Sequence, residues 1–367
     1  MSGLVKDRLD RSMQQCLLMA ESLQNLPDQL PRSINANGEL VTSRSDWWCS
    51  GFFAGSLWYL YEYQPSQTLL DDARRYSQRV EKEKDNKGTH DLGFMLYCSF
   101  GNGYRLTGDT AFRNIMLTGA ESLSSRFNPQ VGCIQSWGAN QKWQFPVIID
   151  NMMNLEFLFW ASKVSGNSKY RDICISHADK TIENHFRPDY SSYHVVSYDP
   201  VSGQVEKKNT AQGYNDDSAW ARGQAWGLYG FTVMYRETQD GKYLEQAKNI
   251  AHFILQHPNL PADKIPYWDF NAPPDAKRDA SAGAIIASAL IELSGYVDPS
   301  LAQRYLSVAE TQIRTLSSPE YFAAKGDNGN FILKHSVGSL PRNSEVDVPL
   351  TYADYYYIEA LLRYQSL

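Results

Sequence analysis

Two aspartates, Asp91 and Asp150, are the side chains in this 367-residue sequence that are best placed for acid–base chemistry. Asp91 directly follows His90, and Asp150 stands at the head of the apolar part of Phe145–Ala161, which is typical of an interior helix. Two carboxyl groups in a partly dry site push their pKa values apart, so that one can donate a proton near neutral pH. The alternative is that each aspartate caps its own helix.

Arg222 is the second candidate for chemistry. It lies in GYNDDSAWARGQAWGLYGF, residues 213–231, among small and apolar residues and close to Trp226. A guanidinium group in such surroundings needs an anionic partner. We expect this partner to be either Asp216 or Asp217, or the carboxylate of a substrate.

Histidines and aromatic residues add to this set. His90 and His194 (in SSYHVV) are candidates, although a lone histidine is usually structural. The chain also has 9 Trp and 23 Tyr, many of them beside polar residues. Side chains that combine a flat apolar face with a polar group suit a cleft that holds sugar rings. A helical core filled with aromatic side chains is the alternative.

The elements that must position these residues follow a repeat. Apolar and amphipathic stretches alternate at about one-sixth of the chain length, and TGDTAF (107–112), SGNSKY (165–170) and QDGKYL (239–244) each precede an amphipathic stretch. This pattern predicts an all-α fold, an (α/α)6 barrel or six-hairpin toroid with small β and loop elaborations, as one domain over residues 1–367. The apolar, inner helices are expected at 50–63, 91–106, 150–164, 219–235, 280–294 and 352–364. The amphipathic, outer helices are expected at 2–25, 68–84, 109–127, 168–186, 242–257 and 299–316.

The segments between these helices are less regular. Residues 26–45 and 128–144 are expected to be loops, and turn signals within 190–212 predict a small hairpin. Residues 320–349 are too many for a plain connection and are predicted to form a lid or a rim of short strands.

In such a barrel all inner helices run in the same direction, so their N-termini surround one mouth. Because helix N-termini carry partial positive charge, this mouth should attract an anion. Polar groups that converge there would form a ligand pocket. The segments that enter the inner helices are 46–48, 90–91, 150, 216–222, 278–279 and 352–354.

Composition excludes several classes of function. A net charge of −6 without long charged runs argues against nucleic-acid or anionic-membrane partners, and no apolar stretch is long enough to span a bilayer. The five cysteines lack CxxC spacing and are expected to be buried free thiols. No metal or cofactor motif is present. The N-terminus has no signal-peptide pattern. We expect the protein in the cytoplasm or the periplasm, as a monomer or a homodimer.

Around the candidate residues named above, the sequence resembles glycoside hydrolase family 88, the unsaturated glucuronyl hydrolases. The resemblance covers nearly the whole chain. It rests on DWWCSGFFAGSLWYLYEY (46–63), HDLGF (90–94), QSWG (135–138), IIDNMMNL (148–155), SSYH (191–194), WARGQAWGLYGF (220–231), YWDF (267–270), RDASAGA (278–284) and DYYYIEALLR (354–363). It implies an enzyme that removes a Δ4,5-unsaturated uronic acid from the non-reducing end of oligosaccharides left by polysaccharide lyases, with glycosaminoglycan fragments as the expected source.

The resemblance also implies roles for individual residues. Asp150 would be the general acid and base, which protonates C-4 of the alkene and helps water to attack C-5. Asp91 would be the second carboxylate, which positions substrate hydroxyl groups and tunes Asp150. The implied substrate-binding residues are Trp48, His90, Trp137, His194, Gln212, Arg222 and Trp226. Trp47 and Cys49 lie in a stretch that varies in the family, and residues 323–349 match only weakly and are expected to set specificity for the next sugar.

Three other interpretations remain open. An unsaturated rhamnogalacturonyl hydrolase would share this fold and chemistry but act on pectin fragments. A sugar epimerase on the same barrel would use histidine bases, and only His90 and His194 are well placed for that role. A barrel that binds sugar without catalysis is disfavoured because both Asp91 and Asp150 are present.

Overall fold

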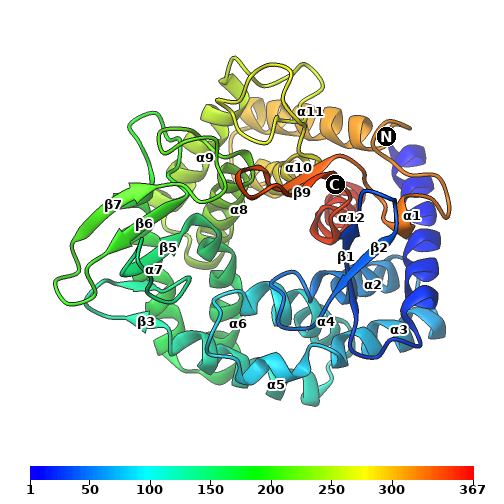
Figure 1. The fold of residues 1–367 in the computed structure, drawn as a ribbon, viewed down its shortest axis with the longest axis horizontal. Helices are drawn as coiled ribbons and strands as arrows, with labels where there is room; N and C mark the ends of the chain where they lie inside the picture. Colours follow the sequence, from blue (N-terminus) through cyan, green and yellow to red (C-terminus); the bar gives the residue numbers. More distant parts are fainter.

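The computed structural model describes residues 1–367 and shows two concentric rings of helices. Contacts between each pair of neighbouring inner helices close the inner ring (Figure 1). The predicted (α/α)6 barrel is therefore confirmed. One apolar cluster of 88 buried residues fills the space within and between the two rings.

The two rings alternate along the chain. The inner helices are α2 (Phe52–Tyr63), the π-helix η2 (Gly93–Gly101) with α4 (Asn102–Thr107), α6 (Leu155–Ser165), α8 (Ala221–Thr238), α10 (Ala280–Ser294) and α12 (Thr351–Gln365). The outer helices are α1 (Ser2–Leu23), α3 (Gln67–Gln78), α5 (Thr110–Ser124), α7 (Ser168–His185), α9 (Gly241–Gln256) and α11 (Pro299–Leu316).

The turn signatures work as combined stop and start signals. Gly108 has φ +66° and ends α4, and the side chain of Asp109 then caps α5 by accepting the N–H of Ala111. The same pair of steps ends α6 and starts α7, where Gly166 has φ +73° and Asn167 is the cap. A left-handed residue followed by an Asx cap reverses the chain within a few residues. The repeated signature therefore produces the antiparallel helix pairs.

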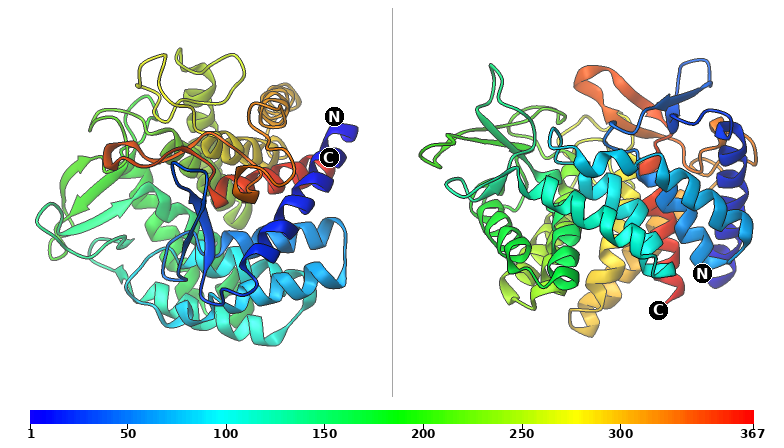
Figure 2. Two further views of the ribbon diagram at one scale, coloured as in Figure 1. Left: turned by 45° about the vertical axis from the view of Figure 1, so that its right-hand side comes forward. Right: turned by 90° about the horizontal axis from the view of Figure 1, so that it is seen from below.

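Short strands gather at the end of the barrel where the inner helices begin, whereas both chain termini lie at the other end (Figure 2). The antiparallel pairs are β1 (Leu30–Ile34) with β2 (Leu40–Ser43), β3 (Phe127–Asn128) with β4 (Cys133–Ile134), and β8 (Ser336–Ser339) with β9 (Ser344–Val348). A three-stranded sheet has the order β5 (Phe145–Ile148), β6 (Val195–Tyr198) and β7 (Val205–Asn209).

These strands confirm the predicted hairpin in 190–212 and the rim of short strands in 320–349. The expected loop at 26–45 was wrong in part, because it contains the β1–β2 hairpin. Arg32 of that hairpin pairs with Glu345 of β9, so a contact between distant segments stabilises it. A local apolar pattern does not predict such a pairing between distant segments.

Three of the predicted helices differ from a continuous α-helix in their winding or continuity. Residues 68–84 were expected as one helix, but α3 ends at Gln78 and a separate 3-10 helix, η1 (Glu81–Asp85), follows. The inner helix after Asp91 begins as a π-helix. The predicted helix 150–164 starts with a 3-10 segment, η3 (Ile149–Asn154), which joins α6. The changed winding directs the side chains at the head of this helix differently from a regular α-helix.

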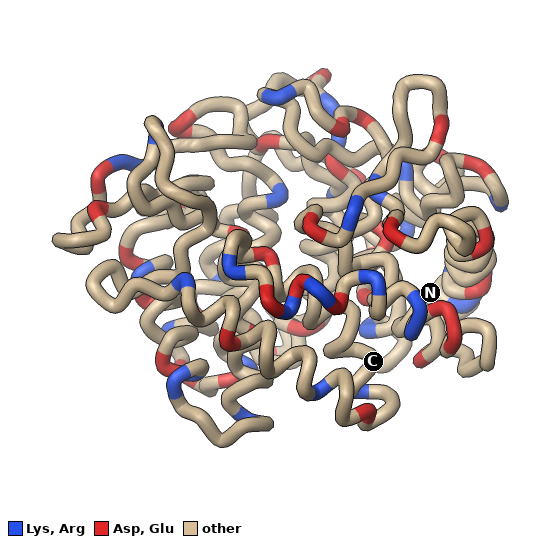
Figure 3. Tube along the Cα trace, turned by 60° about the horizontal axis from the view of Figure 1, so that its bottom comes forward, with Lys and Arg blue, Asp and Glu red and all other residues tan.

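Acidic and basic residues are interspersed along the trace (Figure 3). All five cysteines are buried free thiols, as predicted. None of the helices combines the length and the apolar composition that crossing a membrane requires.

Candidate active site

A cavity of about 520 Å³ lies at the strand-bearing end of the barrel. Its 18 wall residues include seven of the nine predicted site residues: Trp48, His90, Asp91, Trp137, Asp150, Gln212 and Arg222. The cavity is within the range of volumes that hold small ligands. The predicted convergence of polar groups at the inner-helix N-termini is therefore observed. His194 and Trp226 are fully buried and do not form part of the wall.

Asp150 does not cap a helix. It occupies the first turn of η3, whose N-cap is Ile148, and its Oδ2 atom is buried without a hydrogen-bond partner. Burial raises the pKa of the Asp150 carboxyl to about 7, with a further upward contribution from Asp91 and an opposing one from the Arg222 guanidinium. A carboxyl group with such a pKa can donate a proton near neutral pH and accept it again.

His194 lies beside Asp150. Its Nδ1 atom accepts the backbone N–H groups of Ala211 and Gln212, so the ring proton is on Nε2. Nε2 is 3.7 Å from Asp150 Oδ2, and neither atom has another partner. Burial lowers the pKa of His194, which keeps the ring neutral. The N–H of His194 therefore faces the Asp150 carboxyl, which it can orient.

Asp91 is held by its own neighbours. The Thr89 hydroxyl donates to Asp91 Oδ2 at 3.0 Å, and His90 Nε2 is 3.3 Å from Asp91 Oδ1. His90 is itself oriented by Asn151, whose Oδ1 atom is 2.9 Å from His90 Nδ1. His90 thus contacts Asp91 on one side and Asn151, the residue after Asp150, on the other.

The amide of Asn151 is locked in one orientation. Its Nδ2 atom donates to Ile134 O at 2.7 Å and to Ser136 Oγ at 2.9 Å, while Oδ1 accepts from Asn154 Nδ2 at 2.8 Å. Asn151 Oδ1 is therefore the acceptor, and the proton between it and His90 lies on Nδ1. The network is fully buried, and such networks hold side chains in one arrangement.

The partner of Arg222 differs from the two that the local sequence suggested. Asp216 and Asp217 are exposed, whereas the Arg222 guanidinium is buried and its Nη1 atom is 3.3 Å from Asp279 Oδ2 at the start of α10. Arg222 also donates to Val337 O at 2.5 Å and to a second carbonyl of β8, that of Gly338, at 2.8 Å. The expected aspartates were wrong because this pairing joins two inner helices that are distant in the sequence.

Gln212 acts on the same hairpin, because its Nε2 atom donates to Gly338 O at 3.1 Å. Arg222 and Gln212 both line the cavity and both hold β8 in place. The rim of the cavity is thus attached to the inner helices and to the loop that follows β7.

Tryptophan rings form much of the wall. Trp137 packs against Trp143 with ring centroids 5.2 Å apart, and Trp48 packs against Tyr352 at 4.7 Å. Trp226 instead lies beneath the cavity in an aromatic layer formed with Phe94 and Tyr356. Its ring centroid is 5.1 Å from that of Phe94 and 5.4 Å from that of Tyr356. Its indole N–H lowers the pKa of Asp150, so Trp226 still influences the site.

The structure adds wall residues that the sequence interpretation did not select. They are Asn140, Trp143, Ile148, Gly338, Ser339, Arg342, Ser344 and Glu345. Asp46, Trp47 and Tyr352 also line the cavity, in agreement with the expected convergence of segments 46–48 and 352–354 at this mouth. Several of the added residues belong to the β8–β9 rim, for which the only signal was an unusually long polar segment. Arg342, at the tip of this rim, is exposed and has no acidic partner within ion-pair distance. No group of three or more His, Cys, Asp or Glu side chains is arranged to hold a metal ion.

Known proteins are similar to this chain over most of its length. The sequence model of Glycosyl Hydrolase Family 88 matches residues 23–365. An unsaturated glucuronyl hydrolase of Formosa agariphila is 45% identical over 355 residues, covering 95% of this chain and 88% of the relative. An unsaturated chondroitin disaccharide hydrolase of Streptococcus pneumoniae is 36% identical over 86% of this chain and 81% of its own.

A solved structure is similar over the whole molecule. The crystal structure of an unsaturated glucuronyl hydrolase specific for heparin has 49% sequence identity and a TM-score of 0.97, covering 100% of this chain and 98% of its own. The (α/α)6 barrel agrees with this overall structural similarity. The chain belongs to Glycosyl Hydrolase Family 88.

Proposed function

We propose that this glycoside hydrolase is an unsaturated glucuronyl hydrolase that removes a Δ4,5-unsaturated uronic acid from the non-reducing end of lyase-generated glycosaminoglycan fragments. The observation that carries the proposal is the carboxyl group of Asp150, which lines the cavity and whose pKa burial raises to about 7. Two of the relatives named above, one described as an unsaturated chondroitin disaccharide hydrolase and one as specific for heparin, support a glycosaminoglycan source. They give no support to the pectin alternative.

Asp150 would perform both proton transfers. Its protonated carboxyl would donate the proton to C-4 of the alkene, and the resulting carboxylate would remove a proton from the water molecule that adds to C-5. The hemiketal formed at C-5 then opens and releases the remaining sugar, and Asp150 has regained its proton. Because the vinyl ether is hydrated and the anomeric carbon is not displaced, the carboxylate spacing rule for retaining and inverting glycosidases does not apply.

The other residues would hold the substrate and the carboxyls. On the cavity wall, Asp91 can accept hydrogen bonds from sugar hydroxyls, and Gln212 can both accept and donate them. Trp48 and Trp137 can stack on sugar rings. We assign His194 the role of orienting Asp150, since its Nε2–H faces Oδ2 at 3.7 Å.

The test follows the ultraviolet absorbance of the conjugated alkene over time, with the purified protein and a panel of unsaturated disaccharides. The panel contains chondroitin-, hyaluronan-, heparin- and pectin-derived members. Loss of absorbance on a glycosaminoglycan member supports the proposal. Turnover of the pectin member alone would instead support a rhamnogalacturonyl hydrolase, and binding without turnover of any member would support a sugar-binding barrel.

Specificity for the second sugar would depend on the rim, as expected for residues 323–349. Arg342 is a cation without an acidic partner on the cavity wall, so it would contact an anionic substituent on that sugar. We expect Arg342→Ala to raise KM for a sulfated disaccharide by about threefold to tenfold, the value of a partly exposed charged hydrogen bond. KM for the unsulfated disaccharide should stay the same, and an equal rise for both would exclude this role.

We also propose that residues 1–367 form a single catalytic domain, because one apolar cluster joins inner and outer helices around the whole ring. A monomer or homodimer in the cytoplasm or periplasm remains our expectation. Light scattering of the purified protein and fractionation of cells that express it test these two points.

A further inference from the structure

A second cavity, of about 780 Å³, opens at the end of the barrel where the inner helices terminate. We call it the lower cavity, and the cavity that contains Asp91 and Asp150 the upper cavity. The walls of the lower cavity come from all six inner helices, and none of its residues lines the upper cavity. The aromatic layer separates the two spaces, with ring centroids of Trp226 and Tyr356 5.4 Å apart. The proposed reaction uses no residue of this lower cavity.

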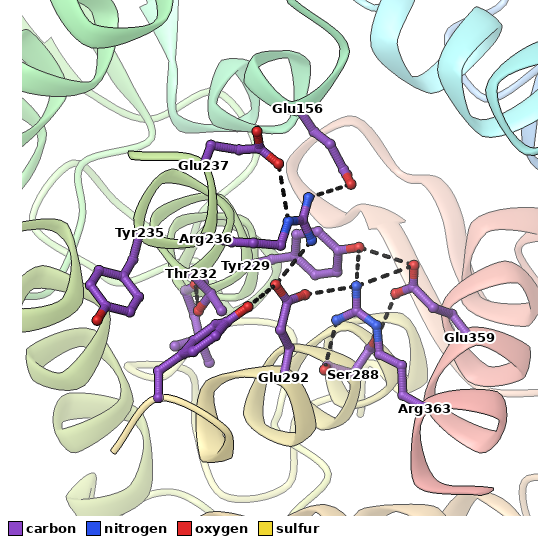
Figure 4. Close-up of polar contacts among 12 residues, drawn as sticks. Glu156, Tyr229, Thr232, Tyr235, Arg236, Glu237, Ser288, Glu292, Glu359 and Arg363 are labelled. Carbon is purple, nitrogen blue, oxygen red and sulfur yellow. Dashed lines mark hydrogen bonds and ion pairs between the residues drawn. The ribbon is translucent and has the colours of Figure 1, made fainter. Parts of the chain in front are cut away.

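A charged network forms one side of the lower cavity (Figure 4). Arg236 donates to Glu156 at 2.5 Å and to Glu292 at 2.9 Å, and Arg363 contacts Glu292 at 2.9 Å and Glu359 at 3.7 Å. The three carboxylates of this network thus face two guanidinium groups, whereas Glu62, on the same wall, pairs with Arg105. The network carries a net negative charge on this side of the cavity.

Two polar groups of the wall are left free by this network. Glu156 accepts the hydrogen bond of Arg236 through Oε1, and its Oε2 atom has no partner. Burial raises the pKa of Glu156 against the opposing effect of Arg236, and Glu292 and Glu359 raise it further. A cation beside Oε2 would therefore stabilise the ionised form of this carboxyl. Tyr356 is 2% exposed and lines the cavity, yet its hydroxyl group makes no hydrogen bond.

Aromatic rings and helix ends favour the same kind of ligand. The rings on the wall are those of Tyr59, Phe94, Tyr97, Tyr104, Trp160, Tyr229, Tyr296, Tyr355 and Tyr356. Aromatic faces attract cations, best when the cation is partly desolvated. The C-terminal ends of the inner helices, which carry partial negative charge, also point to this end of the barrel. The barrel therefore presents opposite polarity at its two mouths.

We propose that the lower cavity is a second ligand site, which binds a small organic ammonium ion between the free oxygen of Glu156, the hydroxyl group of Tyr356 and the surrounding aromatic rings. The upper mouth, with helix N-termini, receives the anionic sugar, and the lower mouth receives a cation. Because Tyr356 contacts Trp226 in the aromatic layer, occupancy of the site should change tryptophan fluorescence.

The test compares two probes of nearly equal shape, tert-butylammonium and tert-butanol, by calorimetric titration of the full-length protein. We expect the ammonium ion to bind at least about tenfold more tightly than the alcohol, in line with a cation–π and charge contribution. Glu156→Gln should weaken ammonium binding about tenfold, the loss of one charged hydrogen bond, and Tyr356→Phe should weaken it about threefold. Glu310→Gln, on the outer helix α11, is the matched control and should leave binding unchanged.

Four results would overturn the proposal. One is equal affinity for the two probes, and another is unchanged ammonium binding in Tyr356→Phe, which decides the matter if Glu156→Gln does not fold. The third is loss of ammonium binding in Asp150→Asn, because this would place the ligand in the upper cavity. The fourth is tighter binding of a neutral sugar such as glucose than of the ammonium ion, because the lower cavity would then not be a site for a cation.

Discussion

Replacing Asp150 by asparagine should abolish turnover and at the same time make the protein more stable. Asparagine has nearly the same shape but can neither donate nor accept the proton, and general acid–base catalysis contributes about 10²- to 10⁴-fold to a rate. The gain in stability comes from the same burial that makes the carboxyl useful. A pKa raised from 3.8 to about 7 means that the folded protein resists ionising this group.

The size of the gain depends on pH. Above its unfolded pKa of 3.8 the carboxyl ionises freely in the unfolded chain but keeps its proton in the folded one, so unfolding becomes easier as pH rises towards about 7. With about 1.4 kcal/mol for each tenfold change, the penalty is about 2 kcal/mol at pH 5 and about 4 kcal/mol at pH 8. Asp150→Asn, which does not ionise, should escape it.

Urea denaturation at pH 5 and pH 8 measures this difference, alongside the absorbance assay for turnover. The control is Asp46→Asn, which changes an exposed carboxylate of the same cavity and should leave the free energy of unfolding nearly unchanged. A stability difference between Asp150→Asn and the wild type that does not grow from pH 5 to pH 8 would refute the burial argument. Substantial turnover by this variant would refute the role of Asp150.

The remaining predictions concern the groups around this carboxyl and the buried histidines. Because the charge of Asp91 raises the pKa of Asp150, Asp91→Asn should move the alkaline limb of kcat/KM below pH 7 as well as lowering the rate; an unmoved limb would contradict the coupling. Asn151→Ala removes the group that accepts the hydrogen bond of His90 Nδ1. It should lower kcat about tenfold, which corresponds to one buried hydrogen bond, with a smaller change in KM. Unchanged kinetics would show that Asn151 does not position His90 for catalysis. Burial lowers the pKa of His177 to about 3, so the folded state opposes its protonation and loses stability as pH falls below 6.5. His177→Gln should lose about 2 kcal/mol less than the wild type between pH 7 and pH 5 in urea denaturation, and equal losses would exclude this histidine as the cause.

The architecture was predictable because the signals that produce it are local. A helix that is apolar on all sides must lie inside, and a left-handed residue followed by an Asx cap at 108–109 or 166–167 reverses the chain wherever it occurs. Repeating these signals at a constant period leaves few arrangements besides a closed double ring. The position of Asp150 at the head of an interior helix was visible for the same reason.

The contacts that turn these residues into a site came only from the tertiary structure. Arg222 pairs with Asp279, and Asn151 orients His90, across separations of about one repeat, and the local sequence favoured nearer partners for Arg222. Likewise, nothing in the polar stretch at 336–348 indicates that Arg222 would hold it as a rim above the cavity. Helix formation depends on residues three or four positions apart, which a sequence displays, whereas the pairing of a buried charge depends on which helices become neighbours when the ring closes.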